Sequence, residues 1–455
     1  MLKKQVIVFF ISVKLRRQRY DFFVFFCTFA TSFFRCMKQE KIPVRLYSEI
    51  GRLNAVLLHK PGPEIEAMTP LNAHHALYQD ILNKDIVDEE YRLFSGVLSK
   101  CTKTYQVRDL LAEVLADSSV ADDLVRRSCL SDGCEYLIPE LLAQKPDQLA
   151  QTLIEGFSYR KGKDNPCFEE GRYVLQPLYN LFFTRDASSC VFDRALINTM
   201  SFQVRAREAF IYKTIFEKFF GAETFRAADM SVEAHTEGGD VQIVRDDLLC
   251  VGCGVRTNAK GIEYLLKAHA HKPRFTVIAQ ELPLEPDSFI HLDMVFTFLG
   301  PHTCMAFEPM VKKTGLFAGK STVAYTIENG VITKKEYPEI LTALRTQGVD
   351  LQPVFCGGDD EWTQLREQWH SGANFFALGP DHVIGYRRNR RTIEALDKAS
   401  FTVLTAEEVV DGGANPFDYE KCVVTFAGSE LPRGGGGARC MTCPVNRDEV
   451  DYNVL

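Results

Sequence analysis

The chain has 455 residues, of which 46% are hydrophobic and 25% are charged, as is typical of a soluble globular protein with a large core. Its formal net charge of -7 argues against broad nucleic-acid binding, which usually requires a basic surface. We therefore expect a small-molecule partner and no nucleic acid.

Residues 1–36 differ in composition from the rest of the chain, with seven Lys or Arg, one Asp and nine Phe. Their apolar run at 22–34 is too short to span a bilayer comfortably, and no small-residue cleavage site follows it. We interpret this segment as a non-native leader or a start codon placed too early, with Met37 as the true beginning, in preference to a secretory signal or an anchor. No other segment could cross a membrane, so we expect no membrane partner.

One order of elements recurs from Leu53 onward: two strands of alternating apolar residues, an amphipathic helix and a further strand. Four copies are expected, at 180–221, 238–282, 291–356 and 374–405. The early strand "LNAVLLHKPG" and the segment after Gly434 are candidates for a fifth unit. The copies share an architecture but no sequence, and they favour a closed, propeller-like α/β ring of ββαβ modules over an open doubly wound sheet.

Residues 75–170 have a different pattern. Segments such as "VRDLLAEVLADSSVADDLVRR" place Leu, Val and Ile at spacings of three and four among charged residues. This spacing is typical of amphipathic helices. We expect a helical subdomain inserted into the ring.

Fourteen cysteines include two C-x-x-C pairs, Cys250/Cys253 and Cys440/Cys443. A zinc ribbon places such pairs about 15 to 20 residues apart, whereas these pairs are separated by most of the C-terminal half. Cys250 and Cys253 also lie in the apolar run "LLCVGCGV", where cysteine serves as a small core residue. We expect reduced cysteines and no metal site.

Four segments place reactive side chains at the ends of expected strands or in turns. They are "NLFFTRD" at 180–186, "HTEGGD" at 235–240, "HLD" at 291–293 and the glycine-rich loop before Cys440. Taken singly, each has a structural explanation as a turn, a bulge, a core histidine or a mobile loop. Equivalent edges of a ring converge on one axis, however, and together the segments provide a thiol, an imidazole and several carboxylates. Carboxylates pair with a planar guanidinium, which favours thiolate attack on a guanidinium carbon.

The segments "YSEIGRLNAVLLHKPG", "NLFFTRD", "EGGDVQIV", "HLDMVFT" and "RCMTCPVNRDEVDY" occur in this order in the chain. In this combination the chain resembles the arginine deiminase family of the guanidine-modifying superfamily, from about Leu46 to Tyr452. The resemblance implies a five-bladed, pseudo-symmetric α/β propeller at 37–455 with an inserted helical domain. It also implies hydrolysis of L-arginine to L-citrulline and ammonia, without a metal or organic cofactor.

The resemblance also assigns roles to single residues. Cys440 is the nucleophile that forms an amidino-thioether, and His291 is the acid and base for ammonia and water. Asp186 and Asp293 hold the guanidinium, assisted by Glu237. In the same way, the resemblance assigns the substrate's α-carboxylate to Asn180, Arg205 and Arg256. It places Phe183 beside the aliphatic stem and makes Asp240 a supporting acid. On their own, the two arginines would be interpreted as surface charges.

The chain departs from some family members at Gly435, where they carry an arginine that gates the pocket. Arg433 and Arg439 are candidates to replace it. The four-glycine run is costly to order and suits a loop that moves for substrate entry. Cys443 has no chemical role in the family pattern, which argues against a redox couple.

Two other functions are compatible with this set of residues. An arginine amidinotransferase or a dimethylarginine hydrolase uses similar chemistry, although both lack the helical insertion and the "CMTCP" ending. A non-catalytic binding protein on the same scaffold is the second alternative. For the arginine deiminase we expect a cytoplasmic homo-oligomer, either a dimer or a tetramer, with L-arginine as its partner.

Overall fold

The computed structural model describes residues 40–78, 80–158, 173–450 and 452. Its contacts divide the chain into two units, 1–41 and 42–455, and the fold described below is that of the second. The interpretation of residues 1–36 as a leader falls outside the described residues, as do positions 159–172 of the expected helical segment.

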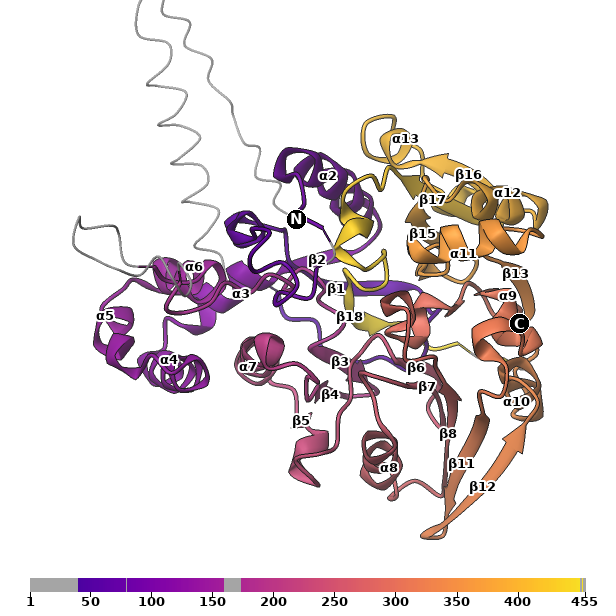
Figure 1. Cartoon of the computed structure of the whole chain (residues 1–455), viewed down its shortest axis with the longest axis horizontal. Coiled ribbons are helices and arrows are strands. Elements are labelled where there is room, and N and C mark those ends of the chain that lie inside the picture. The colour runs from indigo at the N-terminus through magenta and orange to yellow at the C-terminus, as the bar shows by residue number, and fades with distance from the viewer. Residues whose placement is uncertain (1–39, 79, 159–172, 451, 453–455) are drawn as a thin grey trace, which may run out of the picture. The chain divides into compact units, whose positions relative to one another are not determined.

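Five separate sheets form in the described part of the chain (Figure 1). In spatial order their strands are β18 (Cys443–Arg447), β1 (Leu53–Leu58) and β2 (Lys103–Gln106); β3 (Ser188–Val191), β4 (Arg194–Ile197) and β5 (Thr224–Phe225); β12 (Val331–Tyr337), β11 (Thr322–Glu328), β8 (Arg274–Glu281), β7 (Leu248–Cys253) and β6 (Val241–Arg245); β13 (Gln352–Phe355), β10 (Thr303–Ala306) and β9 (Phe296–Phe298); and β14 (Phe376–Gly379), β15 (His382–Tyr386), β17 (Cys422–Phe426) and β16 (Thr402–Thr405).

The helices connect strands within these sheets or precede them. They are α2 (Lys84–Cys101), α3 (Val107–Val114), α4 (Ser118–Asp132), α5 (Ile138–Leu142), α6 (Pro146–Glu155), α7 (Ala206–Ile215), α8 (Ala259–Ala268), α9 (Glu308–Lys312), α10 (Ile340–Thr346), α11 (Glu361–Trp369), α12 (Arg390–Lys398) and α13 (Ala406–Val410).

The predicted order of strand pair, helix and strand is confirmed in the sheets. In three of them an antiparallel pair is followed by a helix and a strand parallel to the second of the pair: β3, β4, α7 and β5; β6, β7, α8 and β8; β9, β10, α10 and β13. The expected fifth unit also forms, because β1 pairs antiparallel with β18 and, after α2, parallel with β2. The result is a mixed α/β fold; the closed propeller stays a prediction.

Two features of the sheets were not predicted. Strand β17, "CVVTF", is buried throughout and lies between β15 and β16, because its apolar β-branched run suits a central strand better than "TVLT". The hairpin of β11 and β12 extends the sheet of β8 at one edge. Strand β12 is almost wholly exposed, including its apolar residues Val331 and Ile332, so it lacks the alternation that identifies a half-buried strand.

Helices form most of the described part of the segment 75–170, but Lys103–Gln106 form β2, which pairs with β1, contrary to the helical expectation at these residues. The Asn83 side chain caps the first turn of α2, and Asp117 does the same for α4, which ends at Gly133 in the left-handed conformation. Helices α3 to α6 lie together to one side of the sheets (Figure 1). Helix α2 instead packs on α13 and connects β1 to β2. Their status as one subdomain stays a prediction.

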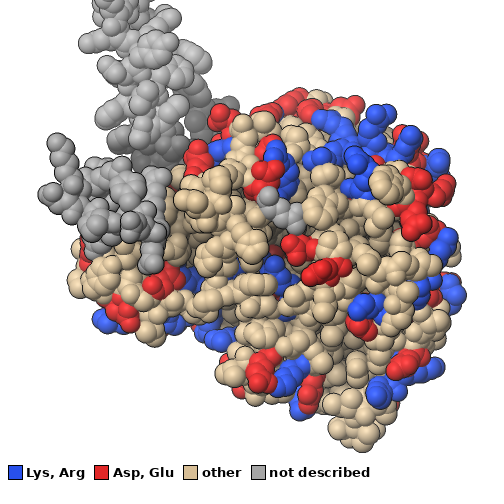
Figure 2. All heavy atoms as spheres, viewed as in Figure 1, with Lys and Arg blue, Asp and Glu red and all other residues tan. Residues whose placement is uncertain are grey.

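Acidic and basic side chains are intermixed over the face shown in Figure 2. This distribution agrees with the modest net charge of the chain, because it provides no broad field of one sign on that face. None of the described helices has the length and apolar character needed to cross a bilayer.

Candidate active site

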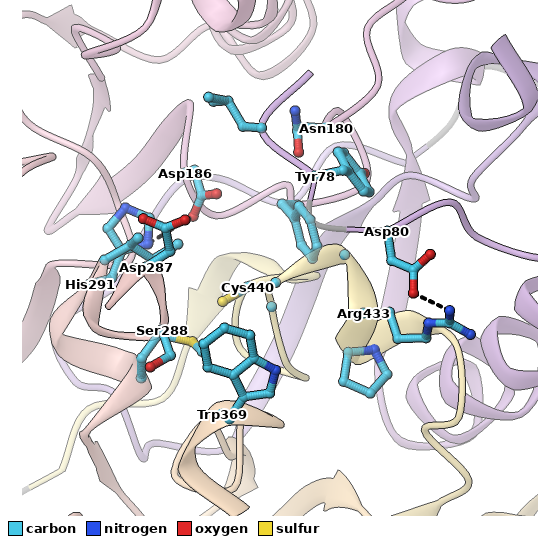
Figure 3. A pocket seen from close by; sticks show the side chains of 18 of the residues that line it. Tyr78, Asp80, Asn180, Asp186, Asp287, Ser288, His291, Trp369, Arg433 and Cys440 are labelled. Atoms are coloured by element: carbon cyan, nitrogen blue, oxygen red, sulfur yellow. Dashed lines mark hydrogen bonds and ion pairs between the residues drawn. The ribbon is translucent and has the colours of Figure 1, made fainter. Parts of the chain in front are cut away.

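A cavity of about 1120 Å³ opens between segments that are far apart in the sequence. Figure 3 shows Cys440 near its centre, with Asp186 and His291 on one side and Asp80 and Arg433 on the other. Seven residues predicted for the site line this cavity: Cys440, His291, Asp186, Asn180, Phe183, Arg205 and Arg256. The other three, Glu237, Asp293 and Asp240, are fully buried behind its wall.

The glycine-rich loop that carries Cys440 is packed closely against its surroundings. A Cβ on Gly436 would lie 2.4 Å from the Phe183 ring, and one on Gly437 would lie 2.6 Å from Asn374 Oδ1. Gly435 has room for a side chain, but its φ of +89° disfavours one. The glycines therefore allow the loop to approach the cavity wall, and β18 begins directly after it.

The sulfur of Cys440 lies between an amide and a carboxylate. The Asn374 side chain donates to Sγ through Nδ2 at 3.2 Å, while the Asp293 carboxylate oxygens lie 3.7 and 3.9 Å from it. Burial raises the pKa of the Cys440 thiol well above its usual value, and Asp293 and Asp186 raise it further. The thiol is therefore protonated in the unliganded site at neutral pH.

The imidazole of His291 is surrounded by carboxylates. Its Nε2 lies 3.1 Å from Glu237 Oε2, and Arg256 Nη1 donates to the same oxygen at 3.2 Å. Burial opposes protonation of His291, but Asp186, Glu237 and Asp240 together raise its pKa to about 9. Burial would likewise raise the pKa of Glu237, but Arg256 and His291 lower it to about 2. His291 is thus an imidazolium held by an ionised glutamate.

Two buried polar atoms face each other at the cavity without a hydrogen-bond partner in the described part of the chain: Asp186 Oδ1 and His291 Nδ1, 3.9 Å apart. The second oxygen, Asp186 Oδ2, accepts from Arg205 Nη1 at 2.7 Å. Unsatisfied buried groups are rare and costly, so these two atoms mark where a polar ligand would bind.

Asp293 is held by the residue that precedes the nucleophile. Arg439 donates to Asp293 Oδ2 at 2.9 Å and to both oxygens of Glu49, at 3.1 and 3.2 Å. Arg439 is 1% exposed and does not line the cavity, so the suggestion that it replaces the gating arginine is wrong. Arg433 does line the cavity, where it pairs with Asp80 and with Glu430.

The predicted carboxylate-binding residues are already engaged with protein groups. Arg205 uses Nε, Nη1 and Nη2 in bonds to Glu208, Asp186 and the Asn180 carbonyl. Arg256 donates through Nη1 to Glu237 and lies over the Phe202 ring at 4.7 Å. Both arginines are buried, contrary to their interpretation as surface charges.

The remaining predicted residues have mainly supporting contacts. Asn180 Nδ2 donates to the Ala76 carbonyl at 2.8 Å. Asp240 Oδ1 accepts from the Leu292 backbone N–H at 2.9 Å, and burial raises the pKa of Asp240 to about 6. Asp240 therefore positions the backbone next to His291 from behind the cavity wall.

Asn374 and Glu49 contact the site but were not predicted. Asn374 follows a short turn, "SGA", and in the sequence it resembles a turn residue. Glu49 lies in "YSEIG", which carried the resemblance but has no reactive pattern of its own. Within the described residues, no group of three or more His, Cys, Asp or Glu side chains could hold a metal ion. The expectation of a metal-free, cofactor-free reaction stays a prediction.

Comparisons with known proteins identify the family. The arginine deiminase family model matches residues 74–447. The chain is 30% identical over 441 residues to an arginine deiminase of Limosilactobacillus reuteri, covering 90% of this chain and 99% of that protein. It is 31% identical over 434 residues to an arginine deiminase of Rhodococcus opacus, covering 90% and 98%.

Among solved structures, an amidinotransferase from Microseira wollei of the saxitoxin biosynthetic pathway is similar, with a TM-score of 0.50. Its sequence is 14% identical, and the match covers 90% of this chain and 98% of that one. At this identity the likeness concerns the fold alone, whereas the family model and the relatives extend over most of the chain. The chain belongs to the arginine deiminase family.

Proposed function

We propose that this chain is an arginine deiminase that hydrolyses L-arginine to L-citrulline and ammonia. The observation that carries the proposal is the position of Cys440 Sγ in one cavity with Asp186 Oδ1 and His291 Nδ1, two buried atoms that lie 3.9 Å apart as an ion pair and lack a hydrogen bond. A guanidinium presents several N–H donors in a plane, which matches a carboxylate oxygen without a hydrogen bond beside a nucleophile. Membership of the arginine deiminase family supports arginine as the substrate.

The guanidinium would bind with its N–H groups toward Asp186 and Asp293. Its positive charge would offset the two carboxylates that raise the pKa of the Cys440 thiol, so that the thiol releases its proton to solvent and the thiolate forms with substrate in place. The sulfur then attacks the guanidinium carbon, and a C–S bond forms. The substrate itself thereby activates its nucleophile.

His291 would supply the next proton. As an imidazolium held by Glu237, it protonates the departing nitrogen, the C–N bond breaks and ammonia leaves. The product of this step is an amidino-thioether on Cys440. Neutral His291 then accepts a proton from water, and the hydroxide adds to the same carbon. Collapse of the adduct breaks the C–S bond, the hydroxyl proton returns to the sulfur, and citrulline is released with the thiol restored.

The positioning of the remaining substrate atoms is also part of the proposal. Arg256, Arg205 and Asn180 would hold the α-carboxylate, with Phe183 against the aliphatic stem. In the described contacts Arg205 donates through three of its nitrogens, whereas the side-chain hydrogen bonds of Arg256 run through Nη1. We therefore assign Arg256 the larger share of carboxylate binding.

The architecture proposed for this enzyme is a five-bladed, pseudo-symmetric α/β propeller at 37–455, in which each of the five sheets is one blade and the helical segment 75–170 is inserted. Five sheets with a repeated strand order support it. A cytoplasmic location, a dimer or tetramer, and the absence of nucleic-acid and membrane partners remain part of the same proposal.

The decisive test is product analysis with protein that starts at Met37. With L-arginine in metal-free buffer, we expect citrulline and ammonia in equal amounts. Cys440→Ser should abolish both products and retain arginine binding by calorimetry, while the matched control Cys443→Ser should keep citrulline formation within about threefold. Asp186→Ala should lose most of the activity. Ornithine in place of citrulline, when a primary amine is added as amidino acceptor, would indicate amidino transfer, and binding without any product in either assay would indicate a binding protein.

A further inference from the structure

Asn374 lies in the short connection between α11 and β14, beneath the nucleophile loop. Its side chain is 1% exposed, and its backbone N–H donates to the Ser371 carbonyl at 3.1 Å. The site residues recognised in the sequence do not include it. Its four side-chain contacts with the loop and with Asp293 make it the central polar group on this side of Cys440.

The orientation of the Asn374 amide is fixed by its partners. The backbone N–H groups of Arg439 and Cys440 both point at Oδ1, at 2.9 and 3.3 Å. Because an N–H group donates, the atom that receives both bonds must be the oxygen. Nδ2 consequently faces the other way, 3.1 Å from the Asp293 carbonyl and 3.2 Å from Cys440 Sγ.

We propose that Asn374 is a catalytic residue that donates a hydrogen bond from Nδ2 to the Cys440 sulfur and stabilises it as a thiolate. The inference rests on the proposed function, in which Cys440 is the nucleophile. No covalent bond of Asn374 changes: the sulfur loses its proton to solvent and keeps the amide as its donor. Hydrogen bonds to ionised acceptors are roughly twice as strong as neutral ones, so this contact strengthens as the thiolate forms.

A hydrogen-bond donor at this position would help to stabilise the Cys440 thiolate, which lies next to a carboxylate. The carboxylate oxygens of Asp293, at 3.7 and 3.9 Å from the sulfur, disfavour a thiolate, and the backbone N–H of Gly437 opposes them by lowering the pKa of the Cys440 thiol. Asn374 adds no charge and presents its positive end to the sulfur. It also binds the loop through Oδ1, so the distance between Nδ2 and Sγ is set by the same side chain.

The loop glycines support this role. The three atoms nearest to a Cβ built on Gly437 all belong to the Asn374 side chain, at 2.6 to 2.8 Å. A larger residue at 437 would displace the amide from the sulfur. The close approach of loop and amide therefore requires glycine at this position.

The test is alkylation of Cys440 in the absence of arginine. Asn374→Asp keeps an oxygen for the two loop N–H groups and replaces the donor by a second oxygen; Asn374→Ser removes both functions. With iodoacetamide between pH 7 and 9, we expect Cys440 in either variant to react at least tenfold more slowly than in the wild type, measured on its peptide by mass spectrometry. In Asn374→Asp, kcat should fall at least 100-fold while KM changes less than fivefold.

Asn389→Ser is the matched control. Asn389 is a buried asparagine at the start of α12 that donates to the His370 carbonyl and does not contact Cys440. In this variant, iodoacetamide should alkylate Cys440 at the wild-type rate. An unchanged rate in the folded Asn374 variants would overturn the inference, and the rate of Asn374→Ser decides if Asn374→Asp does not fold. If Cys440 is alkylated more slowly in the Asn374 variants but the wild type forms no citrulline, the proposed function would be refuted. The inferred hydrogen bond from Asn374 to Cys440 would still stand.

Discussion

Arg439 Nη1 lies 2.9 Å from Asp293 Oδ2, so the residue directly before the nucleophile holds one of the two aspartates of the proposed guanidinium clamp. The same guanidinium bonds to both oxygens of Glu49. Burial would raise the pKa of Glu49, but Arg439 lowers it to about 2. A buried arginine thus connects the loop, the clamp and the segment before β1.

Replacement of this arginine should destabilise the protein. In Arg439→Met, Glu49 and Asp293 remain buried without their cation, and we expect a loss of about 3–5 kcal/mol in the free energy of unfolding. Urea denaturation at pH 7 measures it. The control Arg345→Met removes an exposed partner of Asp350 and should leave the free energy of unfolding nearly unchanged. Equal losses in the two variants would contradict the proposed importance of the buried network.

The raised pKa of His291 predicts a pH dependence. The folded protein keeps this proton up to about pH 9, whereas the unfolded histidine releases it near 6.5. Its stabilising contribution, about 3 kcal/mol at about 1.4 kcal/mol per pKa unit, is complete below pH 6.5 and is lost as the pH rises through about 9. The free energy of unfolding should therefore fall over this range.

The same titration should limit catalysis, because the departing ammonia requires the imidazolium. We expect kcat/KM to decline above about pH 9, with citrulline formation as the readout. His291→Asn should remove the alkaline loss of stability and leave little activity. A wild-type enzyme whose stability is constant from pH 6.5 to 9.5 would show that His291 is neutral in the fold.

Substitutions in the glycine run should differ according to the space at each position. In Gly437→Ala the new Cβ would collide with Asn374, and we expect kcat to fall at least 50-fold. In Gly435→Ala nothing lies within 4 Å, so the cost is the left-handed conformation, about 1–2 kcal/mol of stability, with kcat within about fivefold. Thermal melts and citrulline assays separate the two effects. Similar kcat values for both variants would disprove this distinction.

Arg433 should have only a modest effect on catalysis. Its pair with Asp80 at the cavity is exposed, and exposed pairs contribute less than about 1 kcal/mol. We expect Arg433→Ala and Asp80→Asn each to change kcat/KM by less than about fivefold, with the effect shrinking in high salt. A loss of a hundredfold in Arg433→Ala alone would mean that Arg433 contacts the substrate and replaces the arginine absent at position 435.

Local patterns were sufficient to predict much of the fold. The expected copy at 180–221 ends at Gly221, where the helical run after α7 also ends with a φ of +66°, and the expected copy at 238–282 contains the antiparallel pair β6 and β7. The central place of β17 was missed because strand order depends on partners far away in the sequence. The periodicity of β12 was absent, since that strand has no buried face.

The site shows the same division between local and distant information. Reactive side chains such as Cys440 and His291 were recognisable because their residue types carry chemistry and because family motifs surround them. Asn374 and Glu49 act through contacts with residues distant in the sequence, which no local pattern reveals. Arg439 was misjudged as a gate for the same reason: its burial depends on two carboxylates from other segments.

The pairing of β1 with β18 has a consequence for biosynthesis. Leu57 of β1 pairs with Cys443 of β18, three residues after the nucleophile. Strand β1, which leaves the ribosome early, therefore cannot pair until β18, the last described strand, has been synthesised. A nascent chain that has completed every other sheet still lacks the strand that positions its thiol. Arginine turnover can therefore begin only after β18 has been translated, and a chain truncated before this strand would be inactive.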